Sequence, residues 1–189
     1  MIALSPLLAA LAVAVKLNSP GPILFRQVRA GLGGKDISIC KFRTMTVRKG
    51  SEAGSFDAGD GSRVTSVGRF LRVSKLDELP QLWNVAKGDM ALVGPRPEVH
   101  RWVAAYPERW AFVHTVMPGI TDPAAIVYRH EERILASSAD PERAYREEIL
   151  PHKLRLYEEY VRTRSLLGDC LILARTSFAI VGIGRRNES

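Results

Sequence analysis

Patterns that build zinc centres or disulfide scaffolds are missing from this sequence. Its 189 residues include two cysteines, Cys40 and Cys170, which are far apart and form no metal-binding motif. A reduced, cytosolic setting is therefore the simplest inference from cysteine usage. None of the four histidines has a partner at the His-x-x-x-His spacing of helical zinc sites, so packing and surface roles are expected for them.

Acidic residues are nearly missing from the first quarter of the chain. The formal net charge is +7, and residues 1–50 contain eight Lys or Arg but a single acid, Asp36. Residues 51–189 carry nineteen basic and nineteen acidic side chains, so all of the net charge lies near the amino end. Basic residues next to an apolar segment favour an anionic membrane surface, with each nearby cation contributing about 1 kcal/mol.

The same basic charge could attract nucleic acid. The sequence contains no zinc-finger spacing, no RNP-like motif and no interleaved aromatic run, so an anionic membrane surface is expected as a partner and nucleic acid is not. Gly31-Leu-Gly-Gly34 is not followed by the Gly-Lys-Ser or dinucleotide spacing of phosphate-cradling loops. We therefore interpret this glycine run as a turn.

A hydrophobic run long enough to span a bilayer is missing from the amino end. The uncharged stretch from Ile2 to Val15 would form a helix of about 21 Å, short of the ~30 Å hydrocarbon core. Ser5-Pro6 marks a point where this helix would start or bend. We expect residues 1–17 to form an apolar, membrane-associated helix and residues 18–189 to form one domain.

A secretory signal is the alternative interpretation of the amino end. Ala12-Val-Ala14 resembles a cleavage site, but a basic n-region does not precede the apolar stretch. The membrane-associated helix is therefore favoured.

The segment from Ser74 to Asn84 carries the clearest chemical signal. Pro80 fits a helix only in its first turn, so a helix is predicted to begin between Leu76 and Leu79. Asp77 and Glu78 would then lie at its positive end, where unpaired N–H groups stabilise carboxylates and attract phosphate. This placement would keep Asp77 ionised, and an ionised, positioned aspartate can form an acyl phosphate as a nucleophile.

A plainer interpretation of the same segment is a helix cap. Ser74 and Asp77 match the Ser-x-x-Asp pattern of a capping box, and Glu78 would then simply favour the helix dipole.

Basic residues surround this carboxylate pair in the sequence. Arg96 lies between Pro95 and Pro97, whose fixed φ angles restrain the backbone and aim a planar guanidinium that suits phosphate oxygens. Arg69 and Arg72 precede the pair by a few residues. Two adjacent carboxylates and a rigidly held arginine predict a site that moves a phosphate group.

A hairpin is predicted near this site. Ile23-Leu-Phe25 and the stretch from Ile37 to Phe42 have the composition of short strands on either side of the glycine run. Lys41 and Arg43 alternate with Phe42, which would place both cations on one strand face, toward phosphate, lipid headgroups or solvent.

The remaining segments predict loops and helices. Residues 46–64 are rich in Gly, Ser and charge and are interpreted as a loop, in which Asp57 and Asp60 could pair on a metal but lack a surrounding apolar strand. Residues 141–164 have helical periodicity with a break at Pro151. Residues 165–181 are apolar, which fits a core helix, an interfacial helix or both.

Seven blocks of sequence, spread in order from Ser19 to Thr121, carry a further signal. They are Ser19-Pro-Gly-Pro-Ile-Leu-Phe-Arg-Gln27, Lys41-Phe-Arg-Thr-Met45, Gly68-Arg-Phe-Leu-Arg72, Leu76-Asp-Glu-Leu-Pro-Gln-Leu-Trp-Asn-Val85, Lys87-Gly-Asp-Met90, Val93-Gly-Pro-Arg-Pro97 and Pro118-Gly-Ile-Thr121. In this order they resemble the bacterial sugar transferase family, the monotopic polyprenyl-phosphate phosphoglycosyl transferases. A lone Asp-Glu pair would carry no such weight, but the ordered series is specific.

The resemblance implies a reaction. A sugar 1-phosphate would pass from a UDP-sugar to a polyprenyl (undecaprenyl) phosphate, with release of UMP, as the first membrane step of glycan assembly. Asp77 matches the family's nucleophile, which forms a covalent phosphosugar intermediate, and Glu78 matches the second member of its catalytic dyad. The family uses Mg²⁺, for which Asp77 is the expected contact. The candidate substrate- and phosphate-binding residues are Arg72, Arg96, Lys41, Arg43, Arg69, Pro95 and Thr121.

The resemblance also implies a fold and a location. We expect an α/β, helix-rich α+β chain: a single compact domain with a small sheet and interfacial amphipathic helices, at the cytoplasmic face of the bacterial inner membrane. Ser5-Pro6 resembles the break in the family's re-entrant amino-terminal helix, whose first half would be missing here. Downstream glycosyltransferases are further expected partners.

The sequence departs from the commoner family pattern after Thr121. A glycine usually follows this threonine, whereas Asp122-Pro-Ala-Ala-Ile126 follows here, so sugar or nucleotide recognition could differ at this point. Two alternatives to the covalent mechanism stay open. Polyprenyl phosphate could attack the same donor directly, with Asp77 as a base or metal ligand, or the chain could be a basic binding module without turnover.

Overall fold

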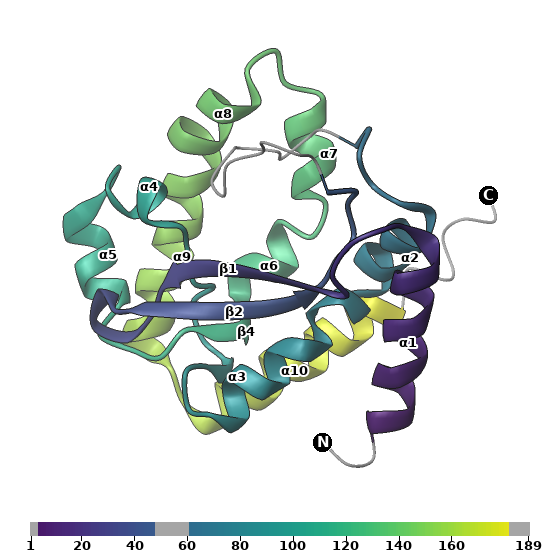
Figure 1. The fold of residues 1–189 in the computed structure, drawn as a ribbon. Helices are drawn as coiled ribbons and strands as arrows, with labels where there is room; N and C mark the ends of the chain where they lie inside the picture. The colour runs from purple at the N-terminus through teal and green to yellow at the C-terminus, as the bar shows by residue number, and fades with distance from the viewer. Residues whose placement is uncertain (1–3, 48–60, 182–189) are drawn as a thin grey trace.

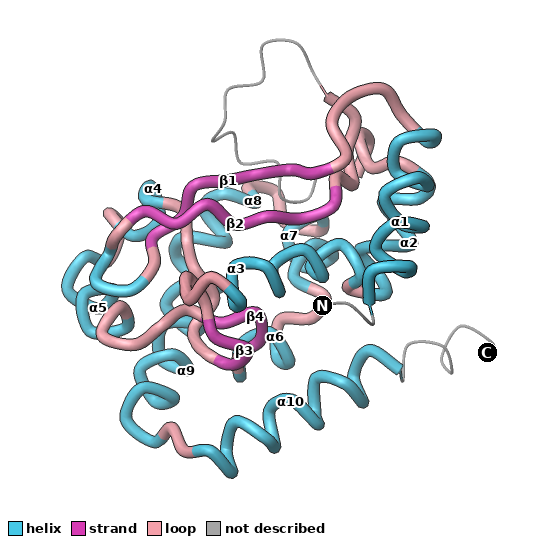
Figure 2. The backbone as a smooth tube through the Cα atoms, turned by 60° about the horizontal axis from the view of Figure 1, so that its bottom comes forward, coloured by secondary structure: helices cyan, strands magenta, loops and turns pink. Residues whose placement is uncertain are grey.

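The fold combines two small two-stranded sheets with many helices (Figure 1). The structure, a computed structural model, describes residues 4–47 and 61–181. β1 (Leu24–Ala30) and β2 (Asp36–Phe42) form an antiparallel hairpin, and β3 (Ala91–Val93) pairs in parallel with β4 (Gly119–Thr121). Figure 2 shows the hairpin and the parallel pair with α3 (Leu82–Ala86) between them.

The predicted single, helix-rich domain with little strand is confirmed, and its described strands form two separate pairs. The second edge of β2 is occupied by a side chain. Asn84 Oδ1 accepts from the Cys40 N–H at 3.3 Å, and Asn84 Nδ2 donates to the Ser38 carbonyl at 2.8 Å. These bonds satisfy the backbone groups that another strand would need.

The predicted hairpin is confirmed, although β1 extends further than expected, to Ala30. Its strands are joined through a short 3₁₀ turn, η2 (Leu32–Gly34). Gly33 and Gly34 have φ angles of 64° and 75°, a left-handed conformation that glycine adopts without steric cost. The glycine run is therefore a turn, as its composition predicts.

The amino end forms α1 (Ser5–Asn18), with Pro6 in its first turn, so the helix begins at the predicted Ser5-Pro6 point. Its buried side chains, Leu11 and Val15, pack with Phe42 and with Leu71 of α2 (Ser66–Ser74). Within residues 4–47 and 61–181, no helix is both long enough and apolar enough to cross a membrane. Re-entrant insertion of α1 remains a prediction.

The carboxyl half supplies the larger hydrophobic core. Its helices are α4 (His100–Val103), α5 (Pro107–Val113), α6 (Pro123–Val127), α7 (Glu131–Ala136), α8 (Pro141–Ala144), the π-helical turn η4 (Tyr145–Ile149), α9 (Leu150–Thr163) and α10 (Leu166–Val181). Trp110, Leu150 and Tyr157 are among the buried residues of this core. The break predicted at Pro151 is not an interruption: α9 follows η4 directly, Ile149 and Leu150 keep helical backbone angles, and a π-helical turn precedes the proline.

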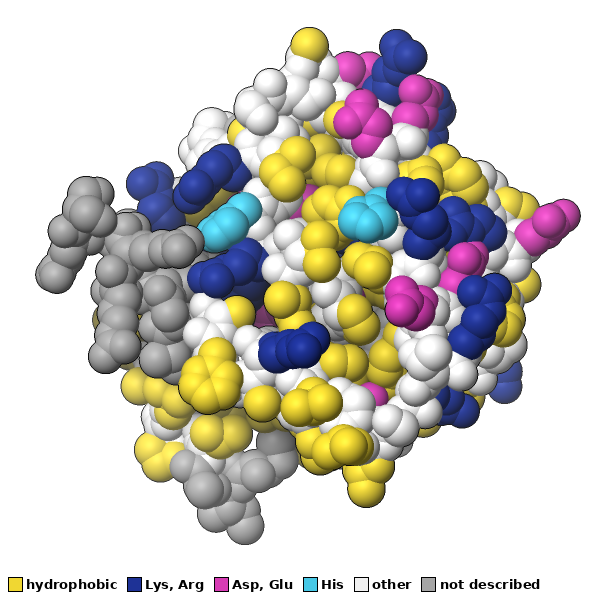
Figure 3. Space-filling view, turned by 180° about the vertical axis from the view of Figure 1, so that it is seen from behind, with side chains coloured by type: hydrophobic (Ala, Val, Ile, Leu, Met, Phe, Trp, Pro, Cys, Tyr) yellow, Lys and Arg dark blue, Asp and Glu magenta, His cyan; other side chains and the backbone are white. Residues whose placement is uncertain are grey.

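One face of α10 contacts the protein, and other side chains of this helix are exposed. Thr176 shares a hydrogen bond of 2.8 Å with Thr121 of β4, whereas Leu166, Leu167 and Phe178 are more than two thirds exposed. Seen from behind, hydrophobic side chains gather over the lower part of the molecule (Figure 3). The candidate metal pair Asp57 and Asp60 lies outside the described residues.

Candidate functional site

The Asp77-Glu78 pair lies in η3, a 3₁₀ helix that runs from Leu76 to Gln81. A left-handed residue, Lys75 with a φ of 57°, separates η3 from α2, so the chain turns sharply just before the carboxylates. The predicted start near Leu76 is confirmed. The capping-box interpretation is wrong, because Ser74 Oγ donates back to the Phe70 carbonyl at 2.8 Å and does not cap η3.

Glu78 is the centre of an ion cluster. Its Oε1 accepts from Arg96 Nη2 at 2.5 Å and from Lys41 Nζ at 2.8 Å, and its Oε2 accepts from Arg96 Nη1 at 3.3 Å. Burial by itself would raise the pKa of Glu78, but the charges and hydrogen bonds of Arg96 and Lys41 hold it well below its ordinary value. Glu78 is therefore ionised at neutral pH, and both cations face one carboxylate.

Asp77 has a different environment. Its side chain is buried, and Oδ1 has no hydrogen-bond partner among the described residues. Burial raises the pKa of Asp77, opposed by the charge of Lys41 and reinforced by that of Glu78. The expectation that a helix end would stabilise the Asp77 carboxylate is wrong in direction, because desolvation outweighs the short 3₁₀ helix and the nearby cations.

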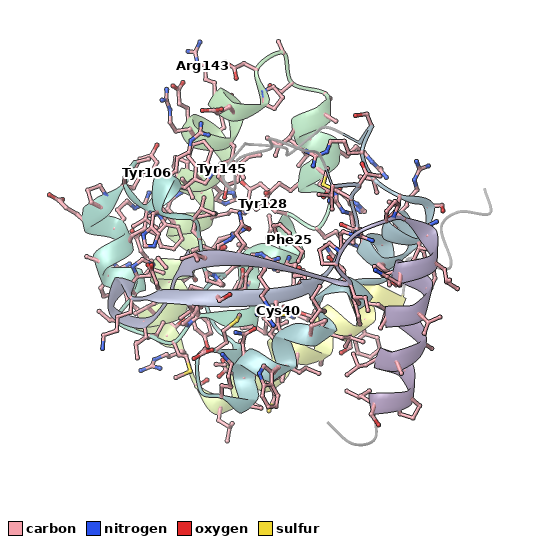
Figure 4. The ribbon with its side chains drawn as sticks, viewed as in Figure 1. Phe25, Cys40, Tyr106, Tyr128, Arg143 and Tyr145 are labelled. Atoms are coloured by element: carbon pink, nitrogen blue, oxygen red, sulfur yellow. The ribbon has the colours of Figure 1, made fainter. Side chains whose placement is uncertain are left out.

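Lys41 and Arg96 lie on two separate parts of the fold, β2 and the loop after β3. Lys41 is on β2, directly opposite Phe25 of β1, a residue labelled in Figure 4. Burial, followed by repulsion from Arg96, lowers the pKa of Lys41. The charge of Glu78 raises the pKa of Arg96 above its ordinary value, so the guanidinium stays charged.

The loop that carries Arg96 is anchored on both sides. Gly119 N donates to the Pro95 carbonyl at 3.0 Å, and Arg29 Nη1 donates to the Pro97 carbonyl at 3.0 Å. Gly94 and Gly119 approach so closely that a Cβ on Gly119 would lie 2.1 Å from the Gly94 nitrogen. The prolines and glycines of these two blocks thus hold the guanidinium in one position, as their fixed geometry predicts.

The other candidate residues are spread over the surrounding elements. Arg72 of α2 donates to Thr44 Oγ1 at 2.9 Å and to Glu132 Oε1 at 2.8 Å. Arg69 is exposed on α2, and Thr121 is buried in β4. Contacts between side chains therefore unite Glu78, Lys41 and Arg96, while Arg72 is joined to α7.

Arg43 does not share a strand face with Lys41, which corrects the prediction from alternation. β2 ends at Phe42, and the buried Arg43 side chain donates to the Pro20 carbonyl at 2.6 Å, the Ser19 carbonyl at 2.7 Å and Ser19 Oγ at 3.0 Å. The turn after α1 needs these donors because its carbonyls point inward. Through these hydrogen bonds, Arg43 links the end of the hairpin to the turn after α1.

This structural role predicts the effect of Arg43→Met. Removal of the guanidinium leaves buried carbonyls unpaired, so the free energy of unfolding should fall by about 2–4 kcal/mol, or roughly 5–15 °C in Tm. Thermal unfolding of the purified protein in detergent measures this change. The exposed Arg69→Met is the matched control and should stay within about 0.5 kcal/mol; equal Tm values for the two variants would refute the structural role.

Asn84 is a site-supporting residue that the sequence does not single out. Besides its two bonds to β2, its amide donates to Asp89 Oδ2 at 3.3 Å, and it is almost fully buried. It thereby fixes α3, and with it η3, against the strand that carries Lys41. Asn84 belongs to the block that contains Asp77, but only tertiary contacts distinguish it from its neighbours.

The ion cluster predicts a pH-dependent effect of Glu78→Gln. Because the folded-state pKa of Glu78 is lowered, its stabilisation is present above the ordinary value of 4.5 and is lost as pH falls below it. At pH 7 the variant leaves two cations without their shared carboxylate, which should lower Tm by roughly 5–15 °C, or about 2–4 kcal/mol. Melting curves from pH 7.5 to 3 should show this gap closing below about pH 4.5.

The matched control for this series is Glu147→Gln. Glu147 pairs with Arg143 and Arg146 on an exposed surface, so its replacement should change Tm by only about 1–2 °C. A gap between wild type and Glu78→Gln that did not depend on pH would argue against an ionised Glu78 as its cause.

The donor set at Asp77 fits Mg²⁺. Mg²⁺ is commonly held by one or two carboxylates together with substrate phosphates and water, and not by an all-protein cage. The described residues contain no group of three or more acidic, His or Cys side chains that could hold a metal. The unpartnered Oδ1 of Asp77 suits the single carboxylate contact that such a shared site needs.

The fold and the site together define a helix-rich α+β domain in which the buried Asp77 lies in η3 next to the ion cluster of Glu78, Lys41 and Arg96. A family model described as bacterial sugar transferase matches residues 1–182. The chain belongs to the bacterial sugar transferase family, as the ordered blocks of the sequence predict.

Several curated proteins are similar to this chain. It is 39% identical over 186 residues to the UDP-N-acetylgalactosamine-undecaprenyl-phosphate N-acetylgalactosaminephosphotransferase of Aeromonas hydrophila, a match that covers 96% of this chain and 41% of that protein. Proteins of Caulobacter vibrioides and Escherichia coli, both named UDP-glucose:undecaprenyl-phosphate glucose-1-phosphate transferase, are 42% identical over 177 residues and 45% identical over 182. These matches cover 91% and 94% of this chain and 61% and 37% of those proteins.

Proposed function

We propose that this protein transfers a sugar 1-phosphate from a UDP-sugar to undecaprenyl phosphate and releases UMP, through a covalent aspartyl intermediate on Asp77. The observation that carries this proposal is the buried Asp77, with an unpartnered carboxylate oxygen, next to Glu78 and the two cations that it pairs with, Lys41 and Arg96. The relatives that carry such activities in their names support the choice of substrates.

The first chemical step forms the intermediate. A carboxylate oxygen of Asp77 attacks the phosphorus that carries the sugar, the bond from this phosphorus to the bridging oxygen breaks, and UMP leaves with the electron pair. Lys41 and Arg96 bind the diphosphate oxygens and stabilise the charge that develops on them. Arg96 does this with a planar fork that the anchored Pro95–Pro97 backbone holds in position.

The second step releases the product. An oxygen of undecaprenyl phosphate attacks the same phosphorus, the bond to Asp77 breaks, and the carboxylate is restored with undecaprenyl diphosphate sugar as the product. When bound, Mg²⁺ would supply charge neutralisation on the diphosphate. Asp77 would hold the ion, and Glu78 keeps Lys41 and Arg96 aligned before the donor arrives.

The second substrate, undecaprenyl phosphate, is a lipid, so the site must reach a membrane. We place the protein at the cytoplasmic face of the bacterial inner membrane. The exposed apolar side chains of α1 and α10, with the positive charge near the amino end, support contact with an anionic bilayer. Glycosyltransferases that extend a lipid-linked sugar would consume the product.

The covalent mechanism is tested by isotope exchange. Labelled UMP should enter the UDP-sugar pool without any acceptor lipid, because the first step is reversible and independent of the second. UDP-glucose and UDP-N-acetylgalactosamine are the first donors to test, since the relatives name these sugars. UMP release that required undecaprenyl phosphate, without entry of labelled UMP into the UDP-sugar, would instead establish direct attack by the lipid phosphate. Absence of both UMP release and exchange with every donor and the acceptor would favour a binding module.

A further inference from the structure

Asp122 lies on the loop after β4, next to the loop after β3 that carries Arg96, and its charge acts on Arg96. β3 and β4 pair in parallel, with Val93 opposite Thr121 and with Gly94 N donating to the Thr121 carbonyl at 3.0 Å. Asp122 is the first residue after β4, and Arg96 lies on the loop that follows the carboxyl end of β3. The two loops therefore emerge side by side at one edge of the pair.

Only half of the Asp122 carboxylate is used by its own helix. Asp122 is completely buried, and its Oδ1 accepts from Ala125 N at 2.8 Å as the N-cap of α6. Its Oδ2 is buried and has no hydrogen-bond partner among the described residues. A cap alone does not require a charged residue, because asparagine caps a helix equally well.

The titratable groups that interact with Asp122 come from two elements. Arg96 lies on the loop after β3, and Lys153, Tyr157 and Tyr160 lie on α9. Burial raises the pKa of Asp122 to about 6, opposed by the Ala125 N–H, by Arg96 and Lys153, and by the Ala124 N–H. Lys153 is itself paired with Glu131 of α7. Arg96 thus has charge partners on two sides of the chain: Glu78 in η3 and Asp122 after β4.

We infer that Asp122 is a positioning residue for Arg96, which holds the guanidinium in place when donor phosphate displaces Glu78 from it. This inference rests on the proposed function, since it assigns Arg96 to the diphosphate. Glu78 and an incoming diphosphate compete for the same N–H groups, so Glu78 by itself cannot hold Arg96 in the substrate complex. Asp122, at the end of the neighbouring strand β4, does not compete with the diphosphate and can hold Arg96 in the substrate complex.

Asp122→Asn tests the inference, because the amide keeps the helix cap and removes the charge. With UDP-sugar, undecaprenyl phosphate and Mg²⁺ at pH 8, kcat/KM should fall by roughly tenfold to a hundredfold, as expected when a reacting group is misplaced. The ratio of wild-type to variant kcat/KM should then shrink toward one as pH drops through about 6, where wild-type Asp122 takes up a proton. Substrate and Asp77 titrations affect both proteins and cancel in this ratio.

Tm provides the second readout. A buried carboxylate with a raised pKa destabilises the folded state at neutral pH, so the Tm of Asp122→Asn should be equal to or above that of wild type. Asp140→Asn is the matched control, because Asp140 caps α8 through Arg143 N at 3.0 Å on an exposed surface. It should keep wild-type turnover and a wild-type pH profile.

The inference and the proposed function fail in different ways. Absence of turnover in both wild type and Asp140→Asn would count against the proposed transferase function. If wild type and Asp140→Asn turn over normally, three results would overturn the role of Asp122. They are an unchanged kcat/KM of Asp122→Asn, a ratio of wild-type to Asp122→Asn kcat/KM that does not depend on pH, and an activity loss that follows a lowered Tm.

Discussion

Asp77→Asn should abolish both UMP release and UMP exchange, with a loss of at least about 10³-fold in kcat. The amide is nearly isosteric with the carboxylate but cannot form the acyl phosphate. In the structure, Asp77 is a buried acid next to Lys41 and Arg96, and no donor among the described residues bonds to its Oδ1. The neighbouring Glu78 cannot replace it, because Arg96 and Lys41 hold both of its oxygens.

Loss of folding is not expected to explain this result. Because burial raises the pKa of Asp77, the ionised carboxylate weakens the folded state at neutral pH, and asparagine should leave Tm unchanged or raised. Asp36→Asn is the control, since Asp36 is an exposed residue on β2 that contacts His100 away from the ion cluster. Near-normal turnover of purified Asp77→Asn would rule out the covalent mechanism.

Arg96→Lys should lower kcat/KM by about 10²–10³-fold, the second largest effect that we expect. Lysine keeps the positive charge but loses the planar fork that now binds both oxygens of Glu78. The same fork is proposed to bind two diphosphate oxygens, and a single ammonium cannot reproduce that geometry. Steady-state kinetics of UMP release, with donor concentration varied, measures the change.

Arg109→Lys is a closely matched control for Arg96→Lys. Arg109 also makes a two-point contact with a carboxylate, through Nε to Glu158 Oε1 at 2.6 Å and Nη2 to Glu158 Oε2 at 3.0 Å, but between α5 and α9. Its replacement removes an equivalent fork without touching the ion cluster. Similar losses of turnover in the two variants would show that the effect is structural and not specific to phosphate.

The main elements near the site could be predicted locally. Pro80 fixes where η3 can begin, and the alternation and glycine turn predict the β1–β2 hairpin. Each of these features depends on backbone restrictions within a few residues of the chain. Ordered sequence blocks were also sufficient to predict the family.

Other properties were decided by the tertiary structure, because they depend on groups that are far apart in sequence. Lys41, Glu78 and Arg96 meet only when β2, η3 and the loop after β3 pack together, and Arg43 turns away from them to bind the turn after α1. Charge states follow the same rule: local sequence placed Asp77 at a favourable helix end, whereas burial in the folded chain raised its pKa. The sequence by itself determined which acidic and basic side chains are available. Packing and desolvation decided which of them face one another and how their pKa values shift.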